Sequence, residues 1–240
     1  MKRHAILYLW LLLIGSLAWA QEVTFTTRVA WANEASSEAS AHSQAGVVVW
    51  LAPLDSPQTE TASSAKPDHL SLVQKNKTFQ PHLLVAPVGA VIEFPNRDPF
   101  FHNVFSLFEG KRFDLGLYEA GTTREVHFNR PGISYIFCNI HPEMSAVVIA
   151  IPTSYYAISD ALGQIVIPDV SPGRYQLHVW YEGAQQENLN AMTKEIMISP
   201  RSATVGVLRL KQPGATQPHK NKYGREYDPS TPSTPGYEQR

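Results

Sequence analysis

The sequence has a single cysteine, Cys138, so it cannot form an intramolecular disulfide. It has no strong excess of either charge, with 20 basic and 21 acidic side chains in 240 residues. Because a nucleic-acid-binding surface needs a basic excess, this balance argues against nucleic acid as a partner. Charged or turn-forming residues also interrupt every apolar run after residue 20, which predicts no membrane span in that part of the chain.

The first twenty residues have the three parts of a secretory signal peptide. Lys2 and Arg3 are followed by an apolar run from Ala5 to Leu17 and by the small-residue ending Ala18-Trp19-Ala20. The run is shorter than the ~20 residues that span a bilayer. We therefore expect cleavage of the signal peptide 1–20 and a soluble, periplasmic or secreted product, with a retained signal anchor as the alternative. Cleavage would leave 18 basic and 21 acidic side chains, a formal charge of −3.

Strand-like segments dominate the rest of the chain, which predicts an all-β fold. Apolar and aromatic residues come in short, often alternating runs separated by Gly, Pro, Asn and Asp. The polar stretch from Asp55 to Ala65 is typical of a linker, and the runs in 66–152 suffice for one β-sandwich. The runs before residue 53 and after residue 152 would form a second sandwich, because two or three strands alone cannot bury a stable core.

The last thirty residues contain almost no aliphatic side chain, so we expect a flexible tail. Docking through Tyr223, Tyr227 or Tyr237 is the alternative. The predicted divisions are the signal peptide 1–20, one sandwich formed by 21–65 and 153–210, an inserted sandwich 66–152, and the tail 211–240.

One short segment combines three side chains that bind soft metal ions. Cys138, His141 and Met144 follow one another at intervals of three residues, so one tight loop can present all three to a single ion. His102, at the start of an earlier strand-like run, supplies a second imidazole. A thiolate, two imidazoles and a weak axial thioether are the ligands of blue-copper electron-transfer sites. The four residues therefore predict copper, since a zinc site would recruit further Cys, His or carboxylate ligands before a Met.

Other interpretations of these residues are less consistent with their neighbours. A lone cysteine in an apolar strand is most often a buried small hydrophobe, and a Cys-His pair can also form a catalytic nucleophile. The adjacent His141 and Met144 argue against the first, and the second lacks an orienting third residue. Three histidines in strand-like runs are interpreted as ordinary residues: His82, His127 and His178. Three others are assigned no role: His42, His69 and His219.

On these residues, the segment 66–152 resembles the plastocyanin, pseudoazurin and amicyanin group of cupredoxins. The resemblance rests on Gly89 to Asn96, Asp98, His102-Asn103-Val104, Phe128 to Gly132, and the loop from Cys138 to Met144, which is as short as that of amicyanin. It implies a Greek-key β-sandwich with one type 1 copper. His102, Cys138 and His141 would be the equatorial ligands, Met144 the axial ligand, and Asn103 would steady the cysteine sulfur.

The flanking parts look like a carboxypeptidase regulatory-like sandwich of the transthyretin type. This likeness rests on the Asp160 to Gly163 turn and on Ser171-Pro172-Gly173-Arg174-Tyr175. The combination is similar to secreted methylamine-utilisation or plastocyanin-like proteins. The loop from Asn33 to Ala45 departs from that pattern, because a Gly/Pro turn is usual between the first two strands.

The resemblance implies one-electron transfer between periplasmic redox proteins such as c-type cytochromes. It implies no enzymatic activity, because no coordination position stays open for a substrate. Two alternatives remain: copper handling, in which the same ligands hold Cu(I) for delivery, and a non-redox interaction module. Ile140 and Pro142 beside His141 form a hypothetical electron exit. The nearby aromatic side chains are expected in the core and the site lining: Phe100, Phe101 and Phe105.

Overall fold

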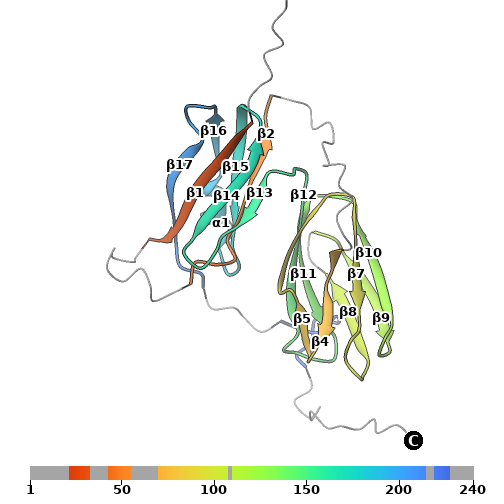
Figure 1. Cartoon of the computed structure of the whole chain (residues 1–240). Helices are drawn as coiled ribbons and strands as arrows, with labels where there is room; N and C mark the ends of the chain where they lie inside the picture. The colour runs from red at the N-terminus through yellow and green to blue at the C-terminus, as the bar shows by residue number, and fades with distance from the viewer. Residues whose placement is uncertain (1–21, 33–42, 56–69, 108–109, 215–218, 228–240) are drawn as a thin grey trace, which may run out of the picture.

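The protein is built almost entirely from strands, which confirms the predicted all-β class (Figure 1). The structure, a computed structural model, describes residues 22–32, 43–55, 70–107, 110–214 and 219–227, so the predicted signal peptide lies outside it. The one helix of the described residues, α1 (Gln186–Met192), spans 7 residues. No helix within these ranges has the length and apolar character needed to cross a membrane.

Two groups of strands lie side by side in Figure 1. The first group contains β1 (Val23–Trp31), β2 (Val48–Pro53), β13 (Tyr156–Ile158), β14 (Gln164–Val170), β15 (Gly173–Trp180), β16 (Lys194–Ile198) and β17 (Thr204–Leu210). The second group contains β3 (Leu70–Ser71), β4 (Val73–Lys75), β5 (Thr78–Gln80), β6 (Leu83–Pro87), β7 (Ala90–Pro95), β8 (His102–Ser106), β9 (Phe113–Tyr118), β10 (Thr123–Phe128), β11 (Gly132–Cys138) and β12 (Ser145–Ile151).

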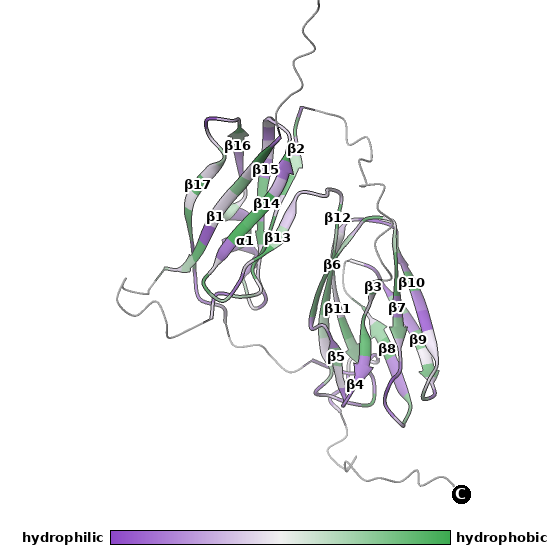
Figure 2. Cartoon of the chain, viewed as in Figure 1, coloured by the Kyte–Doolittle hydropathy of each residue, from purple (hydrophilic) through white to green (hydrophobic). Residues whose placement is uncertain are grey.

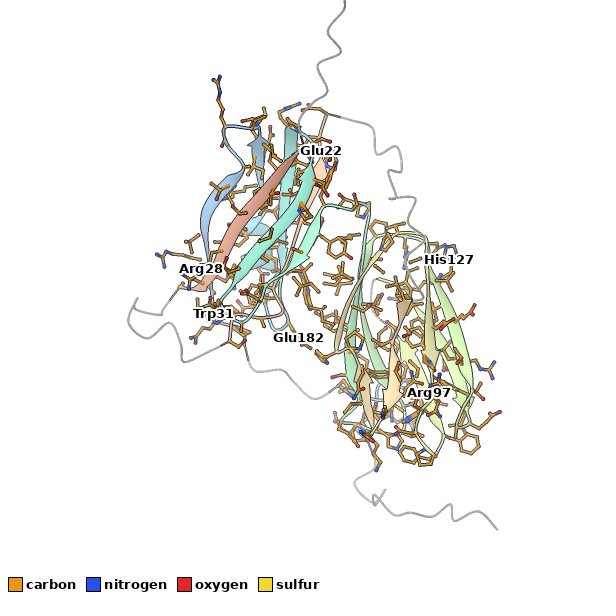
Figure 3. The ribbon with its side chains drawn as sticks, viewed as in Figure 1. Glu22, Arg28, Trp31, Arg97, His127 and Glu182 are labelled. Atoms are coloured by element: carbon orange, nitrogen blue, oxygen red, sulfur yellow. The ribbon has the colours of Figure 1, made fainter. Side chains whose placement is uncertain are left out.

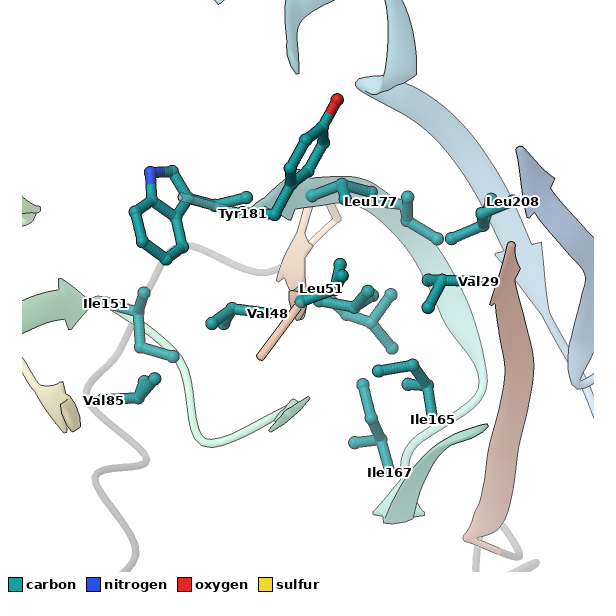
Figure 4. Packing of buried hydrophobic residues seen from close by; sticks show 14 of the residues in the cluster. Val29, Val48, Leu51, Val85, Ile151, Ile165, Ile167, Leu177, Tyr181 and Leu208 are labelled. Carbon is teal, nitrogen blue, oxygen red and sulfur yellow. The ribbon is translucent and has the colours of Figure 1, made fainter. Parts of the chain in front are cut away.

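The first group forms two sheets, with the orders β14-β1-β17 and β13-β2-β15-β16. Its strands alternate between buried and exposed residues, as expected for sheets with one face on a core. In β1, for example, Phe25, Val29 and Trp31 are buried while the residues between them are more exposed or polar. The side chains of both sheets meet in one apolar cluster (Figure 4).

The second group also forms two main sheets, with the orders β10-β7-β3 and β6-β12-β11-β8-β9, and a small hairpin of β4 and β5. Its own apolar cluster includes Phe94, Phe128 and Ile136, together with Cys138 and Met144. The outer strand β10 is largely hydrophilic, whereas the central strands carry long apolar runs (Figure 2). Central strands need such runs because both of their faces are covered.

The first group is assembled from strands that are distant in the sequence. β1 pairs with β14 and β17, and β2 pairs with β13 and β15, so every strand partner of the first two strands follows residue 155. In the chain, the whole second group lies between β2 and β13. Pairing of the first two strands with strands after residue 155 is what an inserted sandwich requires. The domain boundaries and the carboxypeptidase regulatory-like assignment stay predictions.

Strand β12 is covered on both faces and joins the two apolar clusters. Val147, Ile149 and Ile151 belong to the cluster of the first group, whereas Ala146 and Val148 belong to that of the second. Alternate residues of β12 thus point into the two different clusters. Figure 4 shows the contribution of β12 and β6 to this contact, with Ile151 and Val85 close to Val48 of β2.

A polar contact at the edge of this interface also connects the groups. His82, directly before β6, contacts the Glu182 carboxylate through Nε2 at 2.7 Å and the Ser145 carbonyl through Nδ1 at 3.1 Å. Glu182 lies on the side of the first group that faces the second (Figure 3). The hydrogen bond that His82 donates to the Glu182 carboxylate raises the pKa of His82 above its ordinary value, although partial burial acts in the opposite direction.

We predict that Ile149→Ala destabilises the protein by about 2–5 kcal/mol, because it removes a buried side chain at the contact between the groups. Val166→Ala, at a position that is 52% exposed, is the control and should change the free energy of unfolding by less than about 0.5 kcal/mol. Denaturant unfolding followed by tryptophan fluorescence measures both. Equal stabilities of the two variants would contradict the described packing.

We also predict a pH-dependent contribution from the His82–Glu182 contact. Since the folded pKa of His82 is raised, its contribution is complete below the unfolded pKa and disappears as the pH rises through the folded pKa. The side chains are 51% and 35% exposed, so solvent screening limits the effect to less than about 1 kcal/mol. The wild type should therefore exceed Glu182→Gln in stability at pH 5.5 and equal it at pH 9. A difference that grows with pH would contradict this.

Candidate metal centre

Pairing between β8 and β11 brings two of the four predicted ligands together. Cys138, the last residue of β11, lies opposite Val104 of β8 in the antiparallel ladder. Residues opposite each other in a sheet share a face, and so do residues two apart in a strand. His102, two residues before Val104, therefore projects to the same face as Cys138, and both side chains are fully buried.

Three donor atoms converge at this point. The Cys138 sulfur lies 3.6 Å from Nδ1 of His102 and 3.6 Å from Nδ1 of His141, and the two nitrogens are 3.2 Å apart. A point in the plane of these atoms is about 2.0 Å from each, close to the bond lengths of imidazole and thiolate to a metal ion. Among the described residues, His102, Cys138 and His141 are the group of His, Cys, Asp or Glu side chains whose donor atoms lie close enough together to hold one metal ion. The donor spacing thus fits a trigonal metal.

The orientation of His102 is determined by Asp98. Nε2 of His102 donates to Oδ2 of Asp98 at 2.9 Å, which leaves the Nδ1 lone pair directed at the cluster. The Asp98 carboxylate also accepts the backbone N–H groups of Asn76 at 2.6 Å and Lys77 at 3.0 Å. Burial alone would raise the pKa of Asp98, but these hydrogen bonds from Lys77, His102 and Asn76 hold it below its ordinary value.

The loop that carries Asp98 is shaped by the fully buried side chain of Asn96. Its Oδ1 accepts the Asp98 N–H at 3.0 Å and its Nδ2 donates to the Phe100 carbonyl at 2.8 Å. An Asn side chain that bonds to the backbone two residues on is a common way to form a turn. The turn places Phe100 against both imidazoles, with ring centroids 5.4 Å from His102 and 5.4 Å from His141.

Burial keeps both imidazoles neutral, as metal ligation requires. Desolvation lowers the pKa of His102 below its ordinary value, although Asp98 acts in the opposite direction. Desolvation, reinforced by the nearby His102, lowers the pKa of His141 to about 4. The cluster is therefore a set of lone-pair donors at neutral pH and carries little positive charge of its own.

The thiol of Cys138 is held in an apolar environment. Burial raises its pKa above the ordinary value, while backbone hydrogen bonds from Ile140, Asn103 and His141 act in the opposite direction. The resemblance assigns Asn103 to the cysteine sulfur, and the structure places its backbone N–H there. Its side-chain amide donates instead to Asp114 at 2.6 Å. A bound cation would favour the thiolate and displace its proton.

Met144 closes the ligand loop. Its N–H donates to the His141 carbonyl at 3.1 Å, and its carbonyl accepts the Cys138 N–H at 3.3 Å, so the loop returns to the strand within six residues. The Met144 side chain is fully buried in the same apolar cluster as Cys138. The structure thus brings His102, Cys138 and His141 into one cluster and places Met144 in the adjoining core.

The aromatic residues near the site are divided by the fold. Phe105 is buried and Phe100 lines the imidazoles, as expected, but Phe101 is 40% exposed and so is not part of the core. Ile140 is 37% exposed beside the half-buried His141. An exposed apolar side chain, Ile140, therefore directly precedes His141, the cluster member that is partly exposed.

Sequence reasoning gave no role to several residues that contact the site. Asp98 was part of the cupredoxin pattern, and its position four residues before His102 was the available signal. Tyr227 donates to the carbonyl of Cys138 at 2.6 Å, and Lys222 donates to the side chain of Asn139 at 3.0 Å. Both lie in the tail that is predicted to be flexible. For Tyr227 the structure shows the alternative, docking of a tail tyrosine, whereas no local sequence signal indicates the contact of Lys222.

The remaining histidines lie away from the cluster or beside it. His127 is exposed on β10, and His178 stacks on Trp50 with ring centroids 4.9 Å apart. His219 stacks on Phe137, next to Cys138, at 4.1 Å. His42 and His69 lie outside the described residues.

No model of a known protein family matches the chain, and no curated protein matches it. Similar solved structures include a Cu-containing nitrite reductase from Thermus scotoductus SA-01, at 24% identity and a TM-score of 0.34 over 35% of this chain. The match spans 23% of the reductase. A purple cupredoxin from Nitrosopumilus maritimus is 22% identical, with a TM-score of 0.31 over 34% of this chain and 99% of the cupredoxin.

A variant of amicyanin in its reduced Cu(I) form is also similar, at 18% identity and a TM-score of 0.33. That match covers 43% of this chain and 98% of amicyanin. The partial coverage and low identity of these matches leave the function of this chain to be argued from its own residues.

Proposed function

We propose that this chain is an exported electron-transfer protein with one type 1 copper, held by His102, Cys138, His141 and Met144. The observation that supports it best is the triangle of donor atoms, with separations of 3.2–3.6 Å, that the fold forms around Nδ1 of two neutral imidazoles and one thiol. One thiolate and two imidazoles in a plane, with a thioether nearby, suit copper in both of its common oxidation states.

The residues of the chain supply what rapid electron transfer needs. When bound, copper supplies a one-electron couple, and the thiolate of Cys138 gives the strongly coupled bond. Asp98 fixes the orientation of His102, and the turn from His141 to Met144 fixes the other side of the loop. A site with preset ligands rearranges little when the charge of the ion changes, so the reorganisation on electron transfer is small.

The proposed route to a redox partner passes through His141. It is the partly exposed member of the three-residue cluster, whereas His102 and Cys138 are fully buried. Ile140, at 37% exposure, and the exposed Pro142 flank it in the chain and provide the proposed apolar surface. A periplasmic protein such as a c-type cytochrome is the proposed partner, and the site offers no reacting group for enzymatic turnover.

The first prediction from this proposal concerns the visible spectrum of the mature protein with Cu(II). An intense thiolate-to-copper charge-transfer band should appear in the wild type and in His127→Gln, whose histidine is exposed on β10. Cys138→Ser should lose the band because it removes the thiolate. Copper binding without the band would favour copper handling instead of electron transfer, and the absence of binding would favour an interaction module.

A second prediction concerns the carboxylate behind His102. Asp98→Asn leaves fewer acceptors for the Nε2 donor and the two backbone N–H groups, so copper affinity should fall about 10–100-fold. Competition with a chelator measures the affinity. Asp169→Asn, at an exposed position of β14 with φ of 55°, is the matched control and should bind copper as the wild type does. If the two folded variants bind copper with equal affinity, Asp98 does not support the site.

A further inference from the structure

The segment 219–227 packs against three consecutive residues at the end of β11. His219 stacks on the ring of Phe137, with centroids 4.1 Å apart and an interplanar angle of 22°. The Tyr227 hydroxyl donates to the Cys138 carbonyl at 2.6 Å, and the Lys222 N–H donates to Oδ1 of Asn139 at 3.0 Å. One segment, more than eighty residues away in sequence, therefore contacts the proposed cysteine ligand and both of its neighbours.

These contacts restrain the peptide unit that follows the cysteine. Its carbonyl, on Cys138, accepts from Tyr227, and its N–H, on Asn139, donates to the Asn103 carbonyl at 2.9 Å. Both polar ends of the peptide are thus bonded, one to the C-terminal segment and one to the residue after His102. A peptide plane held at both ends cannot rotate without breaking a hydrogen bond, so Cys138 keeps its orientation.

Lys222 extends the same restraint to the other side of the site. Its ammonium group pairs with Oδ2 of Asp114 at 2.8 Å, and Oδ1 of Asp114 accepts the side-chain amide of Asn103 at 2.6 Å. The Lys222 side chain is 19% exposed and that of Asp114 is 42% exposed, so this pair is partly shielded from solvent. The Lys222 N–H contacts Asn139, which follows Cys138, and the Lys222 ammonium reaches Asn103, which follows His102, through Asp114.

The segment has an ordered shape of its own. The side-chain oxygen of Asn221 accepts the N–H groups of Tyr223 and Arg225, and Gly224 adopts a φ of 73° that a turn of this kind requires. Nδ1 of His219 lies 3.1 Å from the Tyr227 hydroxyl, which joins the two ends of the segment. Because the turn orders Lys222 and Tyr227 together, docking costs less entropy than fixing two independent side chains.

We propose that residues 219–227 form a latch that holds the ligand loop in its metal-binding conformation, with Tyr227 as a positioning residue for Cys138. This inference rests on the proposed function. With the latch docked, the loop cannot open to release the ion until the Tyr227 hydrogen bond and the Lys222–Asp114 pair break. The latch thereby slows metal release and limits rearrangement at the cysteine during electron transfer.

The test compares two Tyr→Phe variants of the full mature chain. Tyr227→Phe removes the hydroxyl that contacts Cys138 and keeps the ring. Tyr156→Phe is the matched control, because Tyr156 lies in β13 of the first group and not in the latch. We expect Tyr227→Phe to raise the rate of copper transfer to a Cu(I) chelator about fivefold, which corresponds to the loss of one hydrogen bond. The reduction potential of Tyr227→Phe should also shift. Lys222→Gln should likewise release copper faster, and Tyr156→Phe should change neither the release rate nor the potential.

The outcomes separate the latch from the proposed function. If the charge-transfer band is intact and Tyr227→Phe matches Tyr156→Phe in release rate and potential, the latch is wrong and the copper site stands. If the wild type shows no band, the proposed function is wrong, and docking of the segment is then tested on the metal-free protein. Faster amide hydrogen exchange at Asn139 in Tyr227→Phe than in Tyr156→Phe supports docking, and equal exchange overturns it.

Discussion

The pairing of β8 with β11 is the constraint on which the candidate site depends. It places Cys138 across from Val104 and thereby beside His102, so a thiol and an imidazole from distant parts of the chain share one buried face. The short turn after Cys138 then returns His141 to the same point. Because the ladder is made of backbone hydrogen bonds, the donor triangle forms without help from an ion, and metal binding need not organise the loop.

Burial makes this arrangement chemically useful as well as rigid. Desolvation lowers the pKa of both imidazoles, so their lone pairs are available to a cation at neutral pH, and it raises the pKa of the Cys138 thiol, whose proton a bound cation would displace. Asp98 balances the cost of burying His102 by accepting its outer N–H. The carboxylate is in turn stabilised by two backbone N–H groups, so no charge in this chain of contacts is left without a partner.

The ligand loop is also connected to the rest of the molecule. β12 begins directly after Met144 and is buried on both faces, with Val147, Ile149 and Ile151 packed into the cluster of the first group. The first group of strands thus supports the strand that continues from the loop. At the start of the loop, the segment 219–227 contacts Cys138. Both parts of the chain that lie outside 66–152 therefore help to immobilise the site.

Alternating apolar runs are enough to predict the all-β class, and the chemistry of the side chains is enough to select His102, Cys138 and His141, which the structure places together. Strand periodicity and ligand chemistry are local properties, so a linear pattern reports them. Three features are visible only in the folded chain: the Asn103 side chain turns to Asp114, β12 is shared by two cores, and the tail that is predicted to be flexible docks at Cys138. These contacts join residues that are far apart in the chain. They depend on strand register and burial, which cannot be deduced from the spacing of residues in the sequence.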